Sequence, residues 1–217
     1  GVHGMGRMDK KQEDVFYYLA GTDEICTHPA MPKGAEEGII KGMYKFSSTK
    51  GKSKAKVQLL GSGTILREVI AAAELLARDF DISSDVWSVT SFNELRRDGI
   101  DCERWNMLHP EAKARVSYVE QCLDAKTPVV AATDYIRAYP DQIRSYVKAP
   151  YKTLGTDGFG RSDFRKKLRQ FFEVDRYYVA VAALKALADE GSIEASVVSK
   201  AIKQYQINPD KPNPVTV

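Results

Sequence analysis

The chain has 217 residues, of which 43% are hydrophobic and 28% are charged, and its formal net charge is +3. This composition is typical of a soluble globular chain with one large or two small domains. The net charge is too small to indicate a nucleic-acid-binding protein, and no apolar run approaches the roughly 20 residues of a membrane-spanning helix. No signal-peptide segment opens the chain, so we expect no membrane or nucleic-acid partner.

The first 55 residues contain few regular patterns. Residues 1–10 have no periodicity, and we interpret them as a lead-in or as added residues. The aromatic and β-branched residues of Val15–Leu19 predict a buried strand, the last one of a preceding domain. Residues 36–44 predict a short helix. The lysine-rich residues 45–56 predict an exposed linker or hairpin tip, and the alternative is a segment that holds a phosphate or an acidic partner.

Residues 56–78 form the clearest unit of the sequence. The apolar run Val57–Leu60 predicts a buried strand, and apolar residues at helical spacing after Thr64 predict a helix. A second strand is predicted over 86–90. The crossover between the two strands is too long for a hairpin, so we expect them to pair in parallel within a mostly parallel sheet.

The Gly61-Ser62-Gly63 turn could bind an anion, because a glycine turn at a helix N-terminus exposes backbone N–H groups. The turn lacks the third glycine of a dinucleotide fingerprint and the Gly-Lys-Ser/Thr of a P-loop. We therefore interpret it as a tight strand-to-helix turn in which Ser62 or Thr64 caps the helix.

The middle of the chain alternates between helical and strand patterns. In chain order we predict a helix that stops near Gly99, a helix with one apolar face, a strand, and a helix interrupted at Pro140: 91–100, 116–123, 128–132 and 135–147. His109 could act as an acid–base group. No motif pairs it with a carboxylate or a nucleophile, so we interpret it as a surface or packing residue.

Residues 155–163 form the most distinctive loop, directly after the last predicted strand at 151–154. The loop holds three glycines, two aspartates and one phenylalanine. A loop at the carboxyl end of a parallel strand lies at the edge where open α/β sheets bind ligands or partners. We therefore predict an interface role for this loop, with a plain strand-to-helix connection as the alternative, and its candidate residues are Asp157, Gly158, Phe159, Gly160, Arg161, Ser162 and Asp163.

The last third of the chain is predicted to be helical. Ser162 or Asp163 should cap a helix with its apolar side at Phe164, Leu168, Phe171 and Phe172. The next helix is bounded by Asp175 and Gly191, and its apolar residues run nearly all round, which predicts burial on more than one side. A final amphipathic helix covers 193–205, and a proline-rich tail follows at 208–214.

The three cysteines, Cys26, Cys102 and Cys122, show neither a Cys-x-x-Cys pair nor ligand spacing with histidine. The sequence therefore predicts neither a disulfide framework nor a zinc site. A reducing, cytoplasmic environment fits this pattern best.

Four segments of the sequence are distinctive: Val57–Gly63, Asp85–Phe92, Arg97–Asn106 and Leu154–Asp163. Together they resemble the C-terminal part of the bacterial homodimeric pyruvate dehydrogenases, the acetyl-transferring first components of the pyruvate dehydrogenase complex, which are transketolase-like thiamine diphosphate enzymes. The resemblance runs from about residue 11 to the end and includes His28–Pro32 and the tail.

The resemblance implies a longer parent chain with two further α/β domains. Residues 11–55 would be the end of the middle, pyrimidine-binding type of domain and a linker, and residues 56–217 a C-terminal domain. This domain would have three layers, with a mostly parallel sheet and helices on both faces. The family decarboxylates pyruvate with thiamine diphosphate and Mg²⁺ and acetylates the lipoyl group of the dihydrolipoyl acetyltransferase component. The implied partners are the rest of the parent chain, a homodimer partner and that acetyltransferase.

The family's reactive residues cannot be placed on this sequence. The family holds Mg²⁺ and the diphosphate with a Gly-Asp-Gly segment and a downstream asparagine pair, and Arg97-Asp98-Gly99 lacks both the first glycine and the asparagines. We therefore assign no catalytic, cofactor-binding or metal residue, and we expect an assembly and interface part that is inactive alone and binds no cofactor. The alternative is an independent small α/β protein that binds a phosphorylated ligand at Gly61–Thr64 or at Gly158–Asp163.

Overall fold

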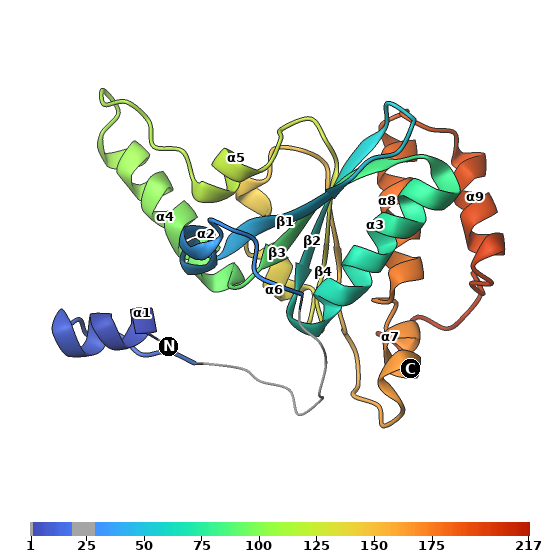
Figure 1. Cartoon of the computed structure of the whole chain (residues 1–217), viewed down its shortest axis with the longest axis horizontal. Helices are drawn as coiled ribbons and strands as arrows, with labels where there is room; N and C mark the ends of the chain where they lie inside the picture. Colours follow the sequence, from blue (N-terminus) through green and yellow to red (C-terminus); the bar gives the residue numbers. More distant parts are fainter. Residues whose placement is uncertain (1, 19–28) are drawn as a thin grey trace. The chain divides into compact units, whose positions relative to one another are not determined.

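A computed structural model describes residues 2–18 and 29–217 of the chain (Figure 1). The chain divides into two compact units, Gly1–Met31 and Pro32–Val217. The described part of the first unit contains two short helices, α1 (Val2–Met5) and the π-helix η1 (Gly6–Lys10). Residues 15–18 are not a strand, and Leu19 lies outside the described residues. This prediction is wrong for the described residues because Phe16 and Tyr18 are almost fully exposed, at 89% and 87%, instead of packing in a sheet.

The second unit is built around a five-stranded sheet with the order β1-β3-β2-β4-β5. The strands are β1 (Met43–Thr49), β2 (Lys56–Ser62), β3 (Ser83–Val89), β4 (Val129–Ala132) and β5 (Tyr151–Leu154). β2 pairs in parallel with both β3 and β4, and β4 pairs in parallel with β5. The predicted parallel pairing is confirmed, and the strand order places β2 at the centre.

β1 is an edge strand that runs antiparallel to β3, with a register shift between Lys45 and Ser47. Most of its residues lie in the segment 45–56 that we interpreted as a linker, and this interpretation is wrong for residues 45–49, while residues 43 and 44 were predicted as the end of a helix that stops at Lys41. Two of the lysines that suggested an exposed linker instead hold the edge strand. Lys45 on β1 and Lys56 on β2 each form an ion pair with Asp85 of β3, at 3.0 and 2.8 Å. The assignment of the residues before β1 to the end of a preceding domain stays a prediction.

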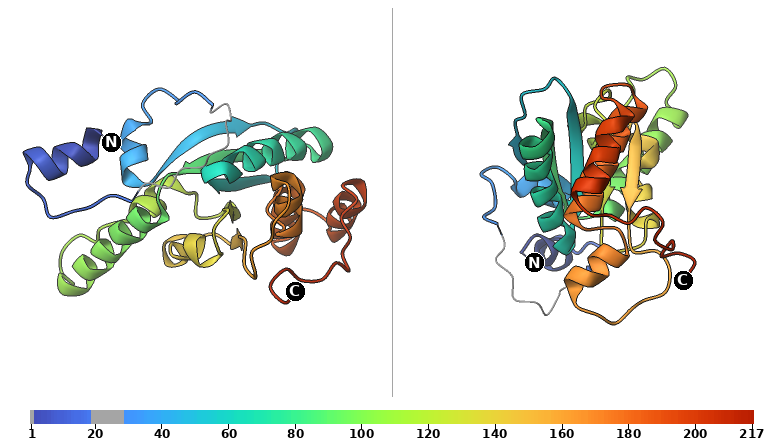
Figure 2. Two further views of the ribbon diagram at one scale, coloured as in Figure 1. Left: turned by 90° about the horizontal axis from the view of Figure 1, so that it is seen from below. Right: turned by 90° about the vertical axis from the view of Figure 1, so that its right-hand side faces the viewer.

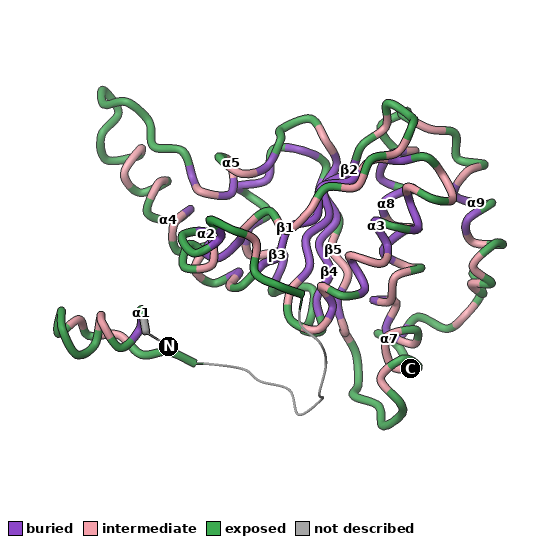
Figure 3. The backbone as a smooth tube through the Cα atoms, in the orientation of Figure 1, coloured by how far each residue is buried: buried purple, intermediate pink, exposed green. Residues whose placement is uncertain are grey.

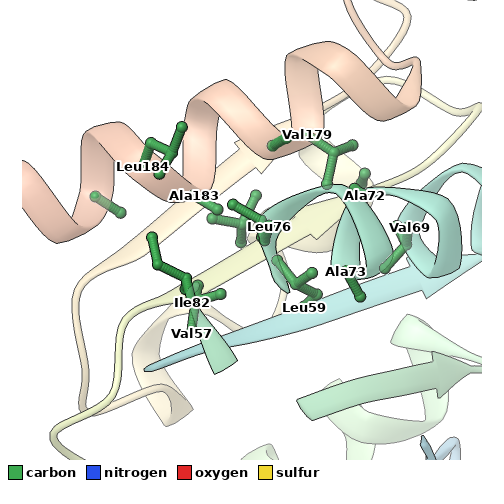
Figure 4. Close-up of a cluster of buried hydrophobic side chains, with 14 of the residues drawn as sticks. Val57, Leu59, Val69, Ala72, Ala73, Leu76, Ile82, Val179, Ala183 and Leu184 are labelled. Carbon is green, nitrogen blue, oxygen red and sulfur yellow. The ribbon is translucent and has the colours of Figure 1, made fainter. Parts of the chain in front are cut away.

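One face of the sheet is covered by α3 (Leu66–Phe80) and α8 (Arg176–Asp189), and α9 (Ala195–Gln204) packs on α8 (Figures 1 and 2). Side chains alternate along a strand, so Val57 and Leu59 of β2 point to this face. There they meet the apolar sides of α3 and α8, as Figure 4 shows for Leu76 and Ala183. The helices predicted for these three segments are confirmed.

The opposite face is covered by α4 (Phe92–Leu108), α5 (Tyr118–Cys122), α6 (Ala138–Asp141) and the 3-10 helix η3 (Arg144–Tyr146), with α2 (Glu36–Lys41) beside β1. Leu60 of β2 and Trp87 of β3 point to this second core. The purple stretches in Figure 3 lie mainly along β2, β3 and β4, which are buried almost throughout, whereas the edge strands β1 and β5 are only partly buried. The predicted three-layer α/β architecture is confirmed.

α4 is longer than predicted, because Gly99 lies in its interior and does not end it. A Cβ at Gly99 would lie 2.3 Å from the ring of Tyr146, so glycine is needed there for close packing and not for a turn. Residues 135–147, by contrast, form only the short helices α6 and η3, because Pro140 lies in the single turn of α6. α5 is also a single turn.

Two predicted helix caps are wrong. Ser62 precedes the 3-10 turn η2 (Gly63–Ile65) but makes no capping hydrogen bond, and α7 (Arg165–Phe171) begins after Phe164, also without a side-chain cap. The hydroxyls of Ser62 and Thr64 instead bind the loop after β4. Asp175 does cap α8, since its carboxylate accepts hydrogen bonds from the backbone N–H groups of Tyr177 and Tyr178. Within residues 2–18 and 29–217, no helix is long and apolar enough to cross a lipid bilayer.

Glu68 joins the start of α3 to the segment around α7 and α8. Its side chain is only 7% exposed and lies 3.3 Å from the Arg169 guanidinium and 2.9 Å from that of Arg176. It also accepts a hydrogen bond from the backbone N–H of Arg176. Burial raises the pKa of Glu68, but the hydrogen bonds and positive charges of the two arginines outweigh burial and hold the pKa below its ordinary value.

We expect Glu68→Ala to lower the free energy of unfolding by about 2 kcal/mol, because two partly buried arginines lose their shared carboxylate while Arg176 stays half-exposed to water. Urea unfolding measures this loss. The matched control is Glu74→Ala on the same helix, where the carboxylate is exposed and we expect a change within about 0.5 kcal/mol. Equal losses in the two variants would contradict the role given to Glu68.

The same interaction gives a pH dependence. A carboxylate with a lowered folded pKa stabilises the protein above its unfolded pKa of about 4.3, and this contribution is lost as the pH falls through the folded pKa. The stability difference between the wild type and Glu68→Gln should therefore be present at neutral pH and shrink on acidification.

Candidate functional site

The candidate site is the carboxyl edge of the sheet, which we define as the loops that follow β2, β4 and β5. Parallel pairing brings the ends of these strands, Ser62, Ala132 and Leu154, to the same edge. The predicted interface loop 157–163 begins three residues after β5 ends. The edge is therefore made by three segments that are far apart in the sequence.

Hydrogen bonds join the loop after β2 to the loop after β4. The Ser62 hydroxyl donates to Thr133 Oγ1 at 2.8 Å, and Thr133 is fully buried. The Thr64 hydroxyl donates to the Asp134 carboxylate at 3.1 Å. These two contacts fix the backbone after β4 against the glycine turn.

The loop after β4 is also joined to the loop after β5. The Thr156 hydroxyl donates to the backbone carbonyl of Asp134 at 2.8 Å. The Asp157 carboxylate accepts a hydrogen bond from the backbone N–H of Arg137 at 3.0 Å, and the Arg137 guanidinium lies 3.6 Å from the same carboxylate. A Cβ at Gly155 would lie 2.7 Å from the Arg137 backbone nitrogen, so the two loops approach closely only because residue 155 is glycine.

The C-terminal tail supports the interface loop. Gly158 has φ of +105°, and a Cβ there would lie 2.3 Å from the carbonyl oxygen of Pro214, which is buried. Lys211 in the same tail donates to the carbonyl oxygen of Phe171 at 2.7 Å and forms an ion pair with Glu173 at 2.9 Å. The tail therefore holds the loop from one side.

The loop presents aromatic side chains to the solvent. Phe159 is 79% exposed, and Phe164, just after the loop, is 84% exposed. Tyr135 of the loop after β4 and Tyr139 of α6 are stacked at 4.7 Å between ring centroids, and both are exposed. The Arg161 guanidinium lies over the Phe171 ring at 5.3 Å. Exposed aromatic residues on a hydrogen-bonded support are typical of surfaces that bind another protein.

The glycine turn is not built for an anionic ligand. The Asp134 carboxylate lies beside Gly63, with Oδ1 3.2 Å from where a Cβ would be, and it accepts the Thr64 hydroxyl. A negative charge therefore already occupies the start of η2 and α3, where a phosphate would have to bind.

Other residues that drew attention in the sequence have structural partners. His109 stacks on Trp105 at 3.7 Å, and its Nδ1 lies 3.0 Å from the Trp105 carbonyl oxygen, which is the packing role that we favoured. Asp98 accepts a hydrogen bond from the backbone N–H of Tyr118 at 2.6 Å. Burial raises the pKa of the Cys102 and Cys122 thiols, whereas Cys26 lies outside the described residues.

The described residues do not fit thiamine diphosphate or its metal ion. In the part of the chain that the structure describes, no group of three or more His, Cys, Asp or Glu side chains is placed to hold a metal ion. The Asp134 carboxylate lies against the glycine turn that could accept a diphosphate. The segment Arg97-Asp98-Gly99 resembles the family's metal motif, but its Asp98 carboxylate accepts a backbone hydrogen bond from Tyr118.

Sequence reasoning missed the loop after β4 and the role of the tail. Thr133 and Asp134 follow directly after the predicted strand 128–132, so their position at a strand end was the available signal. No sequence pattern indicated that Pro214 would pack on Gly158.

The sheet order, with a central parallel strand and helices on both faces, defines the class of the second unit as a three-layer α/β domain. A profile of the family described as the Transketolase-like TK C-terminal domain matches residues 42–175. This match covers more than half of the chain, and the chain belongs to this family.

The chain is also similar to longer proteins. It is 60% identical to the pyruvate dehydrogenase E1 component of Pseudomonas aeruginosa over 214 residues, which are 98% of this chain and 24% of that protein. It is 56% identical to the protein of the same name from Escherichia coli K12 over 213 residues, 97% of this chain and 24% of the relative. The chain thus spans about a quarter of the length of these curated relatives. A solved transketolase structure from Leishmania mexicana shares 20% identity, with a TM-score of 0.46 and coverage of 73% of this chain and 20% of that one.

We expect Gly158→Ala to lower the free energy of unfolding by about 1–3 kcal/mol and to loosen the tail, because alanine is strained at this positive φ and its Cβ would collide with Pro214. Hydrogen exchange at the Thr216 amide, which donates to Asn213, reports the loosening. The control is Gly160→Ala, where a Cβ would meet nothing within 4 Å and stability should be unchanged or slightly higher. Equal exchange rates in both variants would show that the tail does not depend on Gly158.

Proposed function

We propose that this chain forms the C-terminal assembly part of a pyruvate dehydrogenase E1 component. The observation that carries this proposal is the 60% identity over 98% of the chain, because such identity extends through the helices, the strands and the loops of the carboxyl edge. The whole enzyme would oxidatively decarboxylate pyruvate and acetylate the lipoyl group of a dihydrolipoyl acetyltransferase component in the cytoplasm.

Thiamine diphosphate with Mg²⁺ would supply the carbanion chemistry of that reaction, in a site built by other parts of the longer chain. The described residues of this chain do not fit the cofactor, so we assign them no reactive role. Their contribution is a folded domain that packs on the rest of the parent chain and on a homodimer partner.

The interface loop Asp157–Asp163 is the surface that we assign to this packing. Its support is rigid, because Asp157 is bound to Arg137 and Gly158 lies against the tail. A rigid loop loses little conformational entropy on binding, and Phe159 offers a large apolar side chain that is already exposed. The loop would contact the partner subunit or line the approach of the lipoyl arm.

The alternative, an independent module that binds a phosphorylated ligand at Gly61–Thr64 or Gly158–Asp163, has less physical support. At Gly61–Thr64, the Asp134 carboxylate places a negative charge where a phosphate would bind. At Gly158–Asp163, the space beside the Gly158 backbone is filled by Pro214. Titration of the chain with thiamine diphosphate plus Mg²⁺, and separately with nucleotides, distinguishes the proposals. Tight nucleotide binding would favour the alternative.

We expect the 217-residue chain alone to release no CO₂ from pyruvate in the presence of thiamine diphosphate and Mg²⁺, because the residues that the structure describes include no group that fits the cofactor. The same sequence within a full-length E1 chain should be active. Turnover by the 217-residue chain alone would contradict the assembly role.

In the full-length enzyme, we expect the double variant Phe159→Ala with Asp163→Asn to weaken subunit association or lipoyl acetylation by about tenfold or more, because an exposed aromatic anchor is lost. Sedimentation and acetyl transfer measure these two effects. Met107→Ala is the matched control, since Met107 is also largely exposed, at 70%, but lies at the end of α4. If both measurements match the wild type, the loop is a plain connection.

A further inference from the structure

A hollow of about 730 Å³ lies between four helical elements. Its walls come from α3, α7, the start of α8 and the end of α9, and the residues that matter here are Glu74, Arg78, Lys166, Lys167, Arg176 and Tyr177. The volume is within the range of small-molecule sites in proteins, which is about 300–1,000 Å³.

The positive charges around this hollow differ in how far they are neutralised. Arg78 is bound by the neighbouring Asp79, with two hydrogen bonds of 2.7 and 2.9 Å, and Arg176 is bound by Glu68. Lys166 and Lys167 are exposed, and no other residue of the described ranges forms an ion pair with either of them. Two adjacent ammonium groups therefore face the hollow without a carboxylate partner among residues 2–18 and 29–217.

The acidic residues of the hollow do not cancel these charges. Oδ1 of Asp175 accepts hydrogen bonds from the backbone N–H groups of Tyr177 and Tyr178, so this oxygen points to the start of α8. Burial raises the pKa of Asp175. Glu74 is exposed on α3 and is the remaining acid in the lining.

Neutral donors complete the lining. The side-chain amides of Gln170 and Gln204 belong to it, and the rings of Tyr177 and Tyr205 lie 5.0 Å apart on one side. Ammonium and amide groups together are suited to oxygen atoms that carry negative charge.

We propose that this hollow binds a small, multiply charged oxyanion, either a phosphorylated compound or a polycarboxylate. Two ammonium groups favour a ligand with more than one negative charge, because each lysine can then make its own charge-assisted hydrogen bond. The hollow shares no residue with the glycine turn or with the loop Asp157–Asp163, although Lys167 also lies beside the end of that loop. The proposal does not depend on the proposed assembly function.

The test is a titration of the 217-residue chain with inorganic phosphate and, separately, with citrate at constant ionic strength, followed by amide chemical shifts. Saturable shifts should gather at Gln170, Tyr177 and Gln204, and the stronger of the two probes identifies the class of ligand. We expect Lys166→Ala with Lys167→Ala to weaken binding at least about tenfold, since each lost charge-assisted bond contributes of order tenfold. Glu74→Gln should tighten binding, because it removes the remaining acid.

The matched control is Lys200→Ala with Lys203→Ala on α9, which removes the same charge from outside this lining. It should leave the affinity within about twofold, because neither lysine lines the hollow and the charge of an exposed lysine is screened by solvent and salt. Equal weakening in both double variants, shifts spread over all exposed lysines, or no saturable binding of either probe would each overturn the proposal. The fold of every variant is checked by its urea unfolding curve.

Discussion

The burial of β2 on both faces is the constraint on which the rest of the structure depends. Its residues 57–61 are all buried, so each side chain must find an apolar or hydrogen-bonded partner on one face or the other. Val57 and Leu59 pack against α3 and α8, and Leu60 packs in the layer formed by α4 and α5. The one polar side chain, Gln58, is satisfied by the backbone of the loop before β4, with bonds to Asp124 and Thr127 of 3.0–3.1 Å.

This central strand also determines where the candidate site lies. Because β2 pairs in parallel with β4, and β4 with β5, three loops must emerge at one edge. Their hydroxyl and carboxylate groups then bind one another, as in the Ser62–Thr133 and Asp157–Arg137 contacts. These contacts make the edge a firm support for the exposed aromatic rings.

The sequence was sufficient to predict an element where its local residue pattern agrees with its burial in the fold. The strand at 57–60, the helix after it and the start of α8 at Asp175 were predicted correctly, because each depends on residues close in the chain. The errors have a common cause in distant contacts. Lysines 45 and 56 suggested a linker, but Asp85 makes them strand residues. Gly99 suggested a helix end, but the Tyr146 ring requires it inside α4. The glycines of the loop 157–163 marked it as distinctive in the sequence. No local sequence pattern indicated that Arg137 and Pro214 would contact this loop.

The two surfaces that we single out differ in chemistry in a way that follows from their elements. The carboxyl edge carries Phe159, Phe164 and the Tyr135–Tyr139 stack on loops whose own polar groups are already paired, so what remains for a partner is apolar area. The hollow beside α7 is lined by helices whose buried acids, Glu68 and Asp175, are bound to arginine or backbone, so what remains there is the positive charge of Lys166 and Lys167. Apolar area suits contact with a folded subunit, whereas unneutralised charge suits a small anion. One domain can therefore serve assembly at one surface and ligand binding at the other, and Lys167 lies between them, because it lines the hollow and also lies beside the end of the interface loop.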